Sequence, residues 1–255
     1  MTAPFPAQRT AVVTGVGAPR GIGRVVARRL ARDGWSVGLV DIAADGVAEV
    51  ADELRAEGVA AHGVATDITD AGSVAAAFEA FDEQLPPVVG LVNLAGIANP
   101  TAFLDITVEE WERTFAVNAT GSLLMMQAAA RRMVDVGAGR IVNVSSVTAL
   151  DGGGTFSKTA YAAAKAAVLG LTRGGARELG PLGITVNVVL PGPIDTDIMG
   201  GRLTDERKRS MAAGIPVGRV GQPSDIAATV AFLLSEDAGF VNGASYQVDG
   251  GLHMQ

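Results

Sequence analysis

Short apolar segments alternate with longer segments whose apolar residues recur at helical spacing, and this alternation runs along most of the chain. The segments that predict strands are Thr10–Thr14, Ser36–Asp41, Ala61–Thr66, Val88–Asn93, Arg140–Val144, Ile184–Leu190 and Ser245–Val248. The segments that predict helices are Gly23–Asp33, Val47–Glu57, Ser73–Glu83, Thr107–Val136, Thr159–Leu179 and Ser224–Ser235. Strands that are apolar along nearly their whole length indicate a parallel sheet covered by helices on both faces.

Right-handed crossovers between such strands give an α/β fold of the Rossmann type, a doubly wound parallel sheet with about seven strands. No long linker rich in Pro, Ser or Gly divides the chain, so we expect a single domain over residues 1–255. The stretch with the weakest pattern, Asp195–Gly221, follows the sixth strand. It falls at the carboxyl edge of the sheet, where doubly wound proteins bind ligands, and we predict a substrate lid there.

A glycine-rich segment, from Thr14 to Gly23, joins the first strand to the first helix. Small residues such as Gly15, Gly17 and Gly21 let the backbone approach a pyrophosphate, and the free N–H groups at the start of a helix attract its negative charge. A strand precedes the segment and a helix follows it, which favours a dinucleotide site over a plain turn.

Two charged residues near this segment favour different cofactors. Asp41 ends the second strand, where an acidic side chain accepts hydrogen bonds from an adenosine ribose and repels a 2′-phosphate. Arg20 could reach a 2′-phosphate, but an exposed pairing contributes at most about 1 kcal/mol, against about 4 kcal/mol for a charge pair at about 4 Å and an effective dielectric near 20. We therefore predict NAD, with NADP less favoured, and the alternative is that Asp41 only caps a turn. Asp67, after the third strand, is expected at the adenine edge, with a helix N-cap as the alternative.

Tyr161 and Lys165 stand four residues apart, on one face of a predicted helix. A free tyrosine has a pKa near 10, and action as a base near neutral pH needs a fall of roughly three units, or about 4 kcal/mol. A cation about 4 Å away in a moderately low dielectric supplies energy of that size. The helix follows a strand that ends in Val142–Ser146, so the pattern predicts a tyrosine general acid or base with a serine hydroxyl nearby.

With these features the chain resembles the short-chain dehydrogenase/reductase family, and the resemblance covers about residues 10–251. The matching segments are Thr14–Gly23, Asn93–Gly96, Pro191–Thr196 and the terminal Val248–Gly251, together with the serine, tyrosine and lysine above. The resemblance implies a Rossmann fold, an oxidoreductase activity, a nicotinamide cofactor and assembly as a homotetramer.

The resemblance, with the loop chemistry above, also implies roles for individual residues. The catalytic residues are Asn118, which organises a proton-relay water, Ser146, which holds the reacting oxygen, and the Tyr161–Lys165 pair. The expected cofactor-binding residues are Gly15, Arg20, Gly21, Ile22, Gly23, Asp41, Asp67, Ile68, Asn93, Ala95, Gly96, Tyr161, Lys165, Pro191, Gly192, Ile194 and Thr196. The expected substrate-binding residues are Ser146, Thr148, Gly153, Phe156, Tyr161, Pro193 and Met199.

Two departures from the family pattern affect the cofactor side. Five residues lie between Gly15 and Gly21, about two more than is usual, which leaves the role of Gly17 open. Leu94 replaces an asparagine, so a supporting hydrogen bond of the family is expected to be missing.

A third departure affects the serine. Ser146 precedes Tyr161 by 15 residues, about two more than is usual in the family. The strand end identifies Ser146 as the family's serine, and the surplus then falls in the loop Gly152–Gly154. Ser145 and Thr148 are the alternatives.

Composition excludes several other classes of protein. The net charge of −7 argues against a groove that follows nucleic-acid phosphates. Cysteine is absent, which excludes thiolate catalysis and fits a reducing cytoplasm, and His62 and His253 lie too far apart to suggest a metal site. The longest uncharged stretch, Gln84–Leu104, contains three prolines and does not predict a membrane span. Residues 1–8 show no secretory signal, so we expect a cytoplasmic protein without membrane or nucleic-acid partners.

The sequence therefore predicts an NAD-dependent oxidoreductase that interconverts a secondary alcohol and a ketone by hydride transfer, with Tyr161 as the general acid or base. The expected partner is a small, neutral, moderately apolar substrate. One alternative is an NADPH-dependent reductase of 3-oxoacyl thioesters on an acyl carrier protein. Another is a non-catalytic NAD-binding redox sensor, which turnover on a broad substrate panel would exclude.

Overall fold

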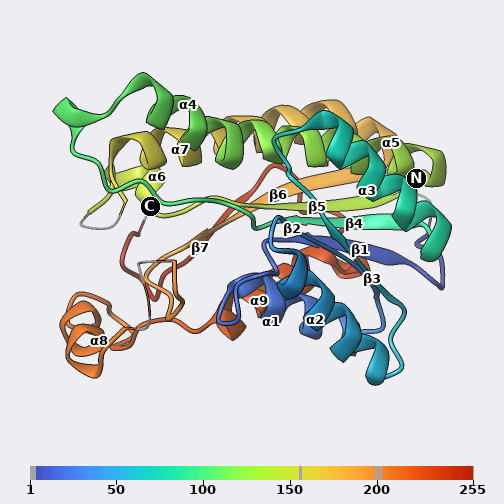
Figure 1. The fold of residues 1–255 in the computed structure, drawn as a ribbon, viewed down its shortest axis with the longest axis horizontal. Helices are drawn as coiled ribbons and strands as arrows, with labels where there is room; N and C mark the ends of the chain where they lie inside the picture. Colours follow the sequence, from blue (N-terminus) through green and yellow to red (C-terminus); the bar gives the residue numbers. More distant parts are fainter. Residues whose placement is uncertain (1–3, 155–156, 199–200, 202, 255) are drawn as a thin grey trace.

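A seven-stranded parallel sheet forms the centre of the protein, as the computed structural model of residues 4–154, 157–198, 201 and 203–254 shows (Figure 1). The strands lie in the order β3-β2-β1-β4-β5-β6-β7. Their bounds are β1 Thr10–Thr14, β2 Ser36–Asp41, β3 Ala61–Ala65, β4 Val88–Asn93, β5 Gly139–Val144, β6 Ile184–Pro191 and β7 Ser245–Val248. The strand order reverses between β1 and β4, which is the switch point of a doubly wound sheet. The predicted fold class is confirmed.

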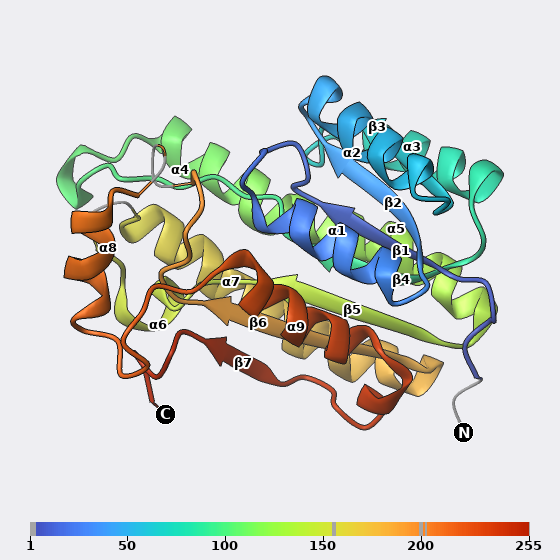
Figure 2. The same ribbon diagram turned by 90° about the horizontal axis from the view of Figure 1, so that it is seen from below.

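Helices cover both faces of this sheet (Figures 1 and 2). One face carries α1 (Ile22–Arg32), α2 (Ala44–Ala56) and α9 (Pro223–Leu234), and the other carries α3 (Ala71–Gln84), α5 (Gly121–Val136) and α7 (Thr159–Leu179). The remaining short elements are α6 (Thr148–Asp151) and the 3-10 turns η1 (Phe103–Asp105), η3 (Gly180–Leu182) and η4 (Glu236–Ala238). None of the helices in the described part of the chain is both long and apolar enough to cross a membrane.

The long helix expected from Thr107 to Val136 is interrupted by a π-helical turn. The capping box at its start is present, because Thr107 Oγ1 accepts from Glu110 N and Glu110 Oε2 accepts from Thr107 N. The helix begins as α4 (Val108–Phe115), widens to the π-helical turn η2 (Ala116–Thr120) and continues as α5. Such turns are rare and often mark functional positions, and this one contains Asn118.

The two ends of the segment predicted as a lid lie next to each other. Ile194 pairs with Gly221 in an isolated parallel bridge, and the chain between them contains α8 (Asp205–Ala212). Figure 2 shows α8 beyond the carboxyl ends of β6 and β7. The sequence pattern missed α8 because none of its residues is buried, so its side chains carry no apolar periodicity.

Candidate active site

A cavity of about 970 Å³ opens at the carboxyl ends of the central strands. Most of the residues predicted for cofactor and substrate line it: Gly15, Gly21, Ile22, Gly23, Asp41, Asp67, Ile68, Ala95, Gly96, Ser146, Thr148, Gly153, Tyr161, Lys165, Pro191, Gly192, Pro193, Ile194 and Thr196. Arg20, Asn93 and Asn118 do not line the cavity directly. Phe156 and Met199, both predicted to bind substrate, lie outside the described residues.

The glycine-rich segment forms a close cradle at one end of this cavity. Gly15 has φ +77°, and a Cβ there would lie 2.9 Å from the backbone nitrogen of Ala95. A Cβ at Gly23 would lie 2.2 Å from the carbonyl oxygen of Gly15. α1 starts after Gly21 without a side-chain cap, so its first N–H groups remain available to an anion. The cradle fits the pyrophosphate of a dinucleotide.

Thr14 joins this segment to β4, a role that the sequence analysis did not assign. Its Oγ1 accepts hydrogen bonds from the backbone nitrogens of Leu94 and Ala95, each at 2.9 Å. The side chain of Leu94, which replaces a family asparagine, is partly buried against the apolar cluster on the α1 face. Leu94 therefore makes apolar contacts at the position where the family has a polar side chain.

Gly17, whose role in the longer glycine-rich segment was left open, contacts the side chain of Asp41. Gly17 N donates to Asp41 Oδ2 at 2.8 Å, and a Cβ on Gly17 would lie only 2.7 Å from Asp41 Cγ. Ala43 N donates to Asp41 Oδ1 at 3.0 Å, so Asp41 also caps a local turn. Two backbone donors hold the carboxylate in one orientation at the cavity wall.

Asp67 lies at the same end and is exposed. Its Oδ1 accepts from Thr69 N and Thr69 Oγ1, and these hydrogen bonds hold its pKa below the ordinary value. The N-cap of α3 is Asp70, so the alternative of a helix cap for Asp67 is wrong.

Arg20 contacts the lid segment. Its Nη2 lies 2.7 Å from Asp195 Oδ1 and its Nη1 lies 3.2 Å from Asp197 Oδ1. Both terminal nitrogens of Arg20 are therefore directed toward carboxylates of the segment predicted as a lid.

Tyr161 and Lys165 lie on α7 and line the cavity, and both are buried. Ser146 lies close enough to the Tyr161 hydroxyl to lower its pKa. Lys165 Nζ lies 5.7 Å from the centroid of the Tyr161 ring and donates to Val144 O at 2.9 Å. The end of β5 and the start of α7 thus bring the serine, tyrosine and lysine together as predicted.

The structure also separates the three candidate hydroxyls. Ser145 Oγ donates to Lys165 O at 2.7 Å and so braces α7 from the side of the strand. Thr148 Oγ1 accepts from Ser146 Oγ at 2.9 Å and lies 3.3 Å from Ser157 Oγ, a neighbour that the sequence did not suggest. Ser146 is the one of the three that acts on the Tyr161 hydroxyl, and α6 and the loop after it lie between Ser146 and α7.

Burial shifts the pKa values of Tyr161 and Lys165 in opposite directions. It raises the pKa of Tyr161 to about 12, with a smaller opposing effect from the Ser146 hydrogen bond. It lowers the pKa of Lys165 to about 8. The expected fall in the tyrosine pKa is not seen, because Lys165 Nζ is directed to Val144 O and desolvation outweighs its charge. At neutral pH Tyr161 is a neutral proton donor beside a largely protonated lysine.

Asn118 is fully buried in the π-helical turn. Its Nδ2 donates to Ile97 O and Thr114 O, each at 3.0 Å, while its Oδ1 has no partner among the described residues. A Cβ on Gly96 would lie 2.6 Å from this Oδ1 and 3.3 Å from Lys165 Nζ. The unpaired acceptor of Asn118 and the amine of Lys165 therefore both border the position of Gly96.

Asn93 forms hydrogen bonds within the sheet, and the residues that follow it line the cavity. Its Nδ2 donates to Asn143 Oδ1 at 2.9 Å and to Ser122 O at 3.2 Å. Asn143 Nδ2 in turn donates to Thr172 Oγ1. This buried network ties β4 and β5 to α5 and α7, so Asn93 acts on the site through the position of the chain that follows β4.

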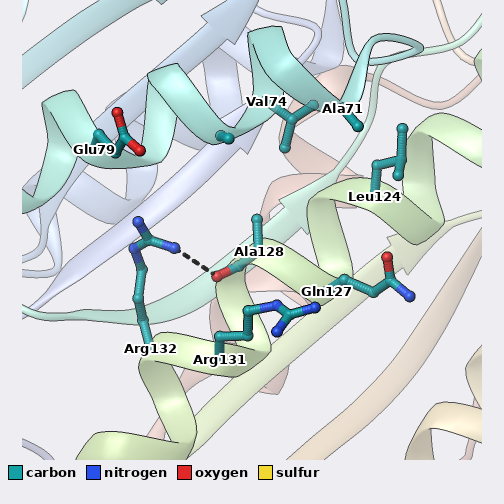
Figure 3. A pocket seen from close by; sticks show the side chains of 9 residues that line it. Ala71, Val74, Glu79, Leu124, Gln127, Ala128, Arg131 and Arg132 are labelled. Atoms are coloured by element: carbon teal, nitrogen blue, oxygen red, sulfur yellow. Dashed lines mark hydrogen bonds between the residues drawn. The ribbon is translucent and has the colours of Figure 1, made fainter.

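A second, smaller cavity of about 280 Å³ lies between α3 and α5, away from this site (Figure 3). Val74 and Leu124 line it, and Arg132, another lining residue, donates to Ala128 O. It contains no residue that the sequence analysis assigned to chemistry.

Comparisons with known proteins agree with this geometry. A family model described as enoyl-(acyl carrier protein) reductase matches residues 15–253. The chain is 43% identical to the cis-4-hydroxycyclohexanecarboxylate dehydrogenase of Sinomonas cyclohexanicum, over 96% of each chain. It is 38% identical to the 3-oxoacyl-[acyl-carrier-protein] reductase of Staphylococcus aureus, over 96% of this chain and 98% of the relative.

A solved structure is similar over nearly its whole length. It comes from Beutenbergia cavernae, is described as a candidate NAD(P)-dependent gluconate 5-dehydrogenase and contains NADP. The TM-score is 0.88 at 37% identity, and the match covers 96% of this chain and 97% of that one. The fold, the site and these relatives define an oxidoreductase with a nicotinamide cofactor. The chain belongs to the short-chain dehydrogenase/reductase family.

Proposed function

We propose that the protein is an NAD-dependent oxidoreductase that interconverts a secondary alcohol and a ketone. The observation that carries this proposal is the grouping of Ser146, Tyr161 and Lys165 on the wall of one cavity, which Asp41 also lines. The bound nicotinamide would supply the hydride or accept it.

The residues of the chain supply the proton and the positioning. In ketone reduction, the Tyr161 hydroxyl donates its proton to the carbonyl oxygen, and Ser146 hydrogen-bonds the same oxygen. The positive charge of Lys165 stabilises the phenolate that remains. Asn118 would hold the water that passes a proton between Tyr161 and solvent. Gly15, Gly23 and the start of α1 would hold the pyrophosphate, and the remaining predicted cavity residues would contact the nicotinamide and the substrate.

Asp41 is the basis for the choice of NAD. Its fixed carboxylate can accept hydrogen bonds from a ribose, whereas a 2′-phosphate would meet a like charge. The experiment is a fluorescence titration of NADH and NADPH in parallel, followed by a panel of secondary alcohols and ketones. We expect NADH to bind at least about tenfold more tightly, or about 1.4 kcal/mol, and to support turnover.

A second candidate function is reduction of 3-oxoacyl thioesters with NADPH. The similarity to the Staphylococcus aureus enzyme favours it. Tighter binding of NADPH together with turnover of a 3-oxoacyl thioester would place this function first. Normal NADH binding without any turnover across the panel would support a redox sensor instead.

The burial of Lys165 leads to a prediction for pH. Its pKa of about 8 means that it is cationic below that value and neutral above it. Because ketone reduction leaves a phenolate that needs this cation, kcat/KM for reduction is expected to fall about tenfold per unit as the pH rises above about 8. Initial rates between about pH 6 and about pH 9.5 measure it. Lys165→Met should show a low rate without this decline, and the same decline in that variant would assign it to another group.

We also propose that the protein assembles as a homotetramer, as its family resemblance implies. Large apolar side chains remain exposed on the α4–α5 surface, at Trp111 and Val134, and near α9 and β7, at Phe232 and Phe240. Two separate apolar surfaces are what two kinds of subunit contact need. A stable monomer at micromolar concentration in sedimentation experiments would contradict this assembly.

A further inference from the structure

Arg20 and Asp41 give opposite signals for the adenosine end of the cofactor, and the structure separates the two side chains. Asp41 borders the cavity, whereas Arg20 is directed to the lid segment. We propose that Asp195 and Asp197 are specificity-determining residues for the cofactor, because they hold Arg20 against the lid and withhold it from a 2′-phosphate. This inference rests on the proposed dinucleotide site and deepens it.

Both terminal nitrogens of Arg20 are engaged by the lid. Nη2 lies 2.7 Å from Asp195 Oδ1, and Nη1 lies 3.2 Å from Asp197 Oδ1. The Asp195 side chain is only 9% exposed, and that of Arg20 is 33% exposed. The carboxylate of this pair is therefore largely shielded from solvent, whereas the guanidinium is partly exposed.

A second cation fixes Asp195 as an anion. Lys208, on α8, lies 2.5 Å from Asp195 Oδ2. Lys208 first, and then Arg20, hold the pKa of Asp195 below its ordinary value. Asp195 therefore stays charged at neutral pH and attracts Arg20 whenever the lid is in this position.

The backbone prevents Asp195 from following Arg20 into the cavity. Asp195 N donates to Gly221 O at 2.9 Å, next to the bridge between Ile194 and Gly221. Arg20 can reach a 2′-phosphate only by leaving both carboxylates. Any attraction that it gains from the phosphate must first replace two ion pairs, one of which is largely buried.

The next guanidinium along the chain, that of Arg24 on α1, is also engaged. Arg24 is buried, and its Nε donates to Val16 O at 3.0 Å while its Nη2 donates to Glu49 Oε2 at 2.7 Å. The same Nη2 lies 3.2 Å from Gly17 O, behind the loop. Since Arg20 and Arg24 are both held elsewhere, this segment offers a 2′-phosphate no cation to offset the charge of Asp41.

The test is to remove the two lid carboxylates. In the double variant Asp195→Asn/Asp197→Asn, Arg20 loses its ionic partners and becomes available to the cofactor. Fluorescence titration should show the Kd for NADPH falling about tenfold or more, with the Kd for NADH changing less than about threefold. Adding Arg20→Ala should remove the gain. If the double variant does not fold, the more exposed Asp197 can be replaced alone, with an expected gain of about threefold.

Lys208→Gln is the matched control. It breaks the other ion pair of Asp195 but leaves Arg20 facing both carboxylates, so NADPH affinity should stay at the wild-type value. Circular dichroism melting confirms that each variant is folded. The inference is overturned if folded carboxylate variants gain no NADPH affinity, if Lys208→Gln gains as much, or if the gain survives Arg20→Ala. Tighter binding of NADPH by the wild type would instead overturn the proposed preference for NAD, so the two failures are distinguishable.

Discussion

Replacing Tyr161 with phenylalanine is expected to lower kcat for ketone reduction by about a thousandfold, or about 4 kcal/mol of activation free energy. The ring keeps its buried packing, and only the hydroxyl near Ser146 is lost. General acid catalysis contributes about 10²- to 10⁴-fold. The Kd for NADH should change less than about threefold. Steady-state kinetics and fluorescence titration on the same preparation measure both quantities.

The chain provides its own control for this experiment. It has two tyrosines, and the other one, Tyr246, lies on β7 and packs against the apolar cluster on the α1 face. Tyr246→Phe removes the same hydroxyl at a distance from the cavity and should leave kcat unchanged. If Tyr161→Phe keeps more than about a tenth of the wild-type rate, Tyr161 is not the general acid.

The strands could be predicted from the sequence because each is a short apolar run bounded by turns. The bounds of β1, β2, β4 and β7 agree with the expectation to the residue, as do those of α7. The pattern failed where a helix has no apolar face. The exposed residues of α8 pack against no core, so nothing in their order distinguishes a helix from a loop. The π-helical turn was missed for a related reason, since one extra residue in a helical turn changes no apolar spacing enough to be noticed.

The sequence predicts which residues form the site, but it does not predict their pKa values. The positions of Ser146, Tyr161 and Lys165 follow from a strand end and a helix face, which the sequence displays. The direction of the Tyr161 pKa does not follow, because it depends on burial and on the carbonyl of Val144 that the lysine contacts. Spacing along a helix shows which groups are neighbours, but their desolvation is set by the whole fold.

Long-range contacts explain the other differences. The partners of Arg20 lie 175 and 177 residues away in the chain, so no local pattern pairs them. Gly17 was uncertain because its purpose is to leave space for Asp41, which arrives from a different strand. Both residues concern the adenosine end of the cavity, where the balance between NAD and NADP is decided.

Replacing Asp41 with asparagine is expected to shift the ratio of NADPH to NADH affinity by about 100-fold toward NADPH, or about 2.7 kcal/mol. Asparagine keeps an acceptor for one of the two backbone donors, Gly17 N or Ala43 N, but removes the negative charge. The full repulsion is about 4 kcal/mol at about 4 Å and an effective dielectric near 20, and partial solvent exposure reduces it. Parallel titrations of the two cofactors measure the ratio.

Asp67→Asn tests whether the cofactor preference depends on where a negative charge lies in the cavity or only on its presence there. Asp67 borders the same end of the cavity, but we expect it to meet the adenine edge, which NADH and NADPH share. Its replacement should therefore weaken both cofactors alike and leave their ratio within about twofold of the wild type. If Asp41→Asn leaves the ratio of NADPH to NADH affinity unchanged, Asp41 does not determine the cofactor preference. An equal shift in Asp67→Asn would attribute the preference to the general negative potential of the cavity, because only a carboxylate beside the ribose discriminates a 2′-hydroxyl from a 2′-phosphate.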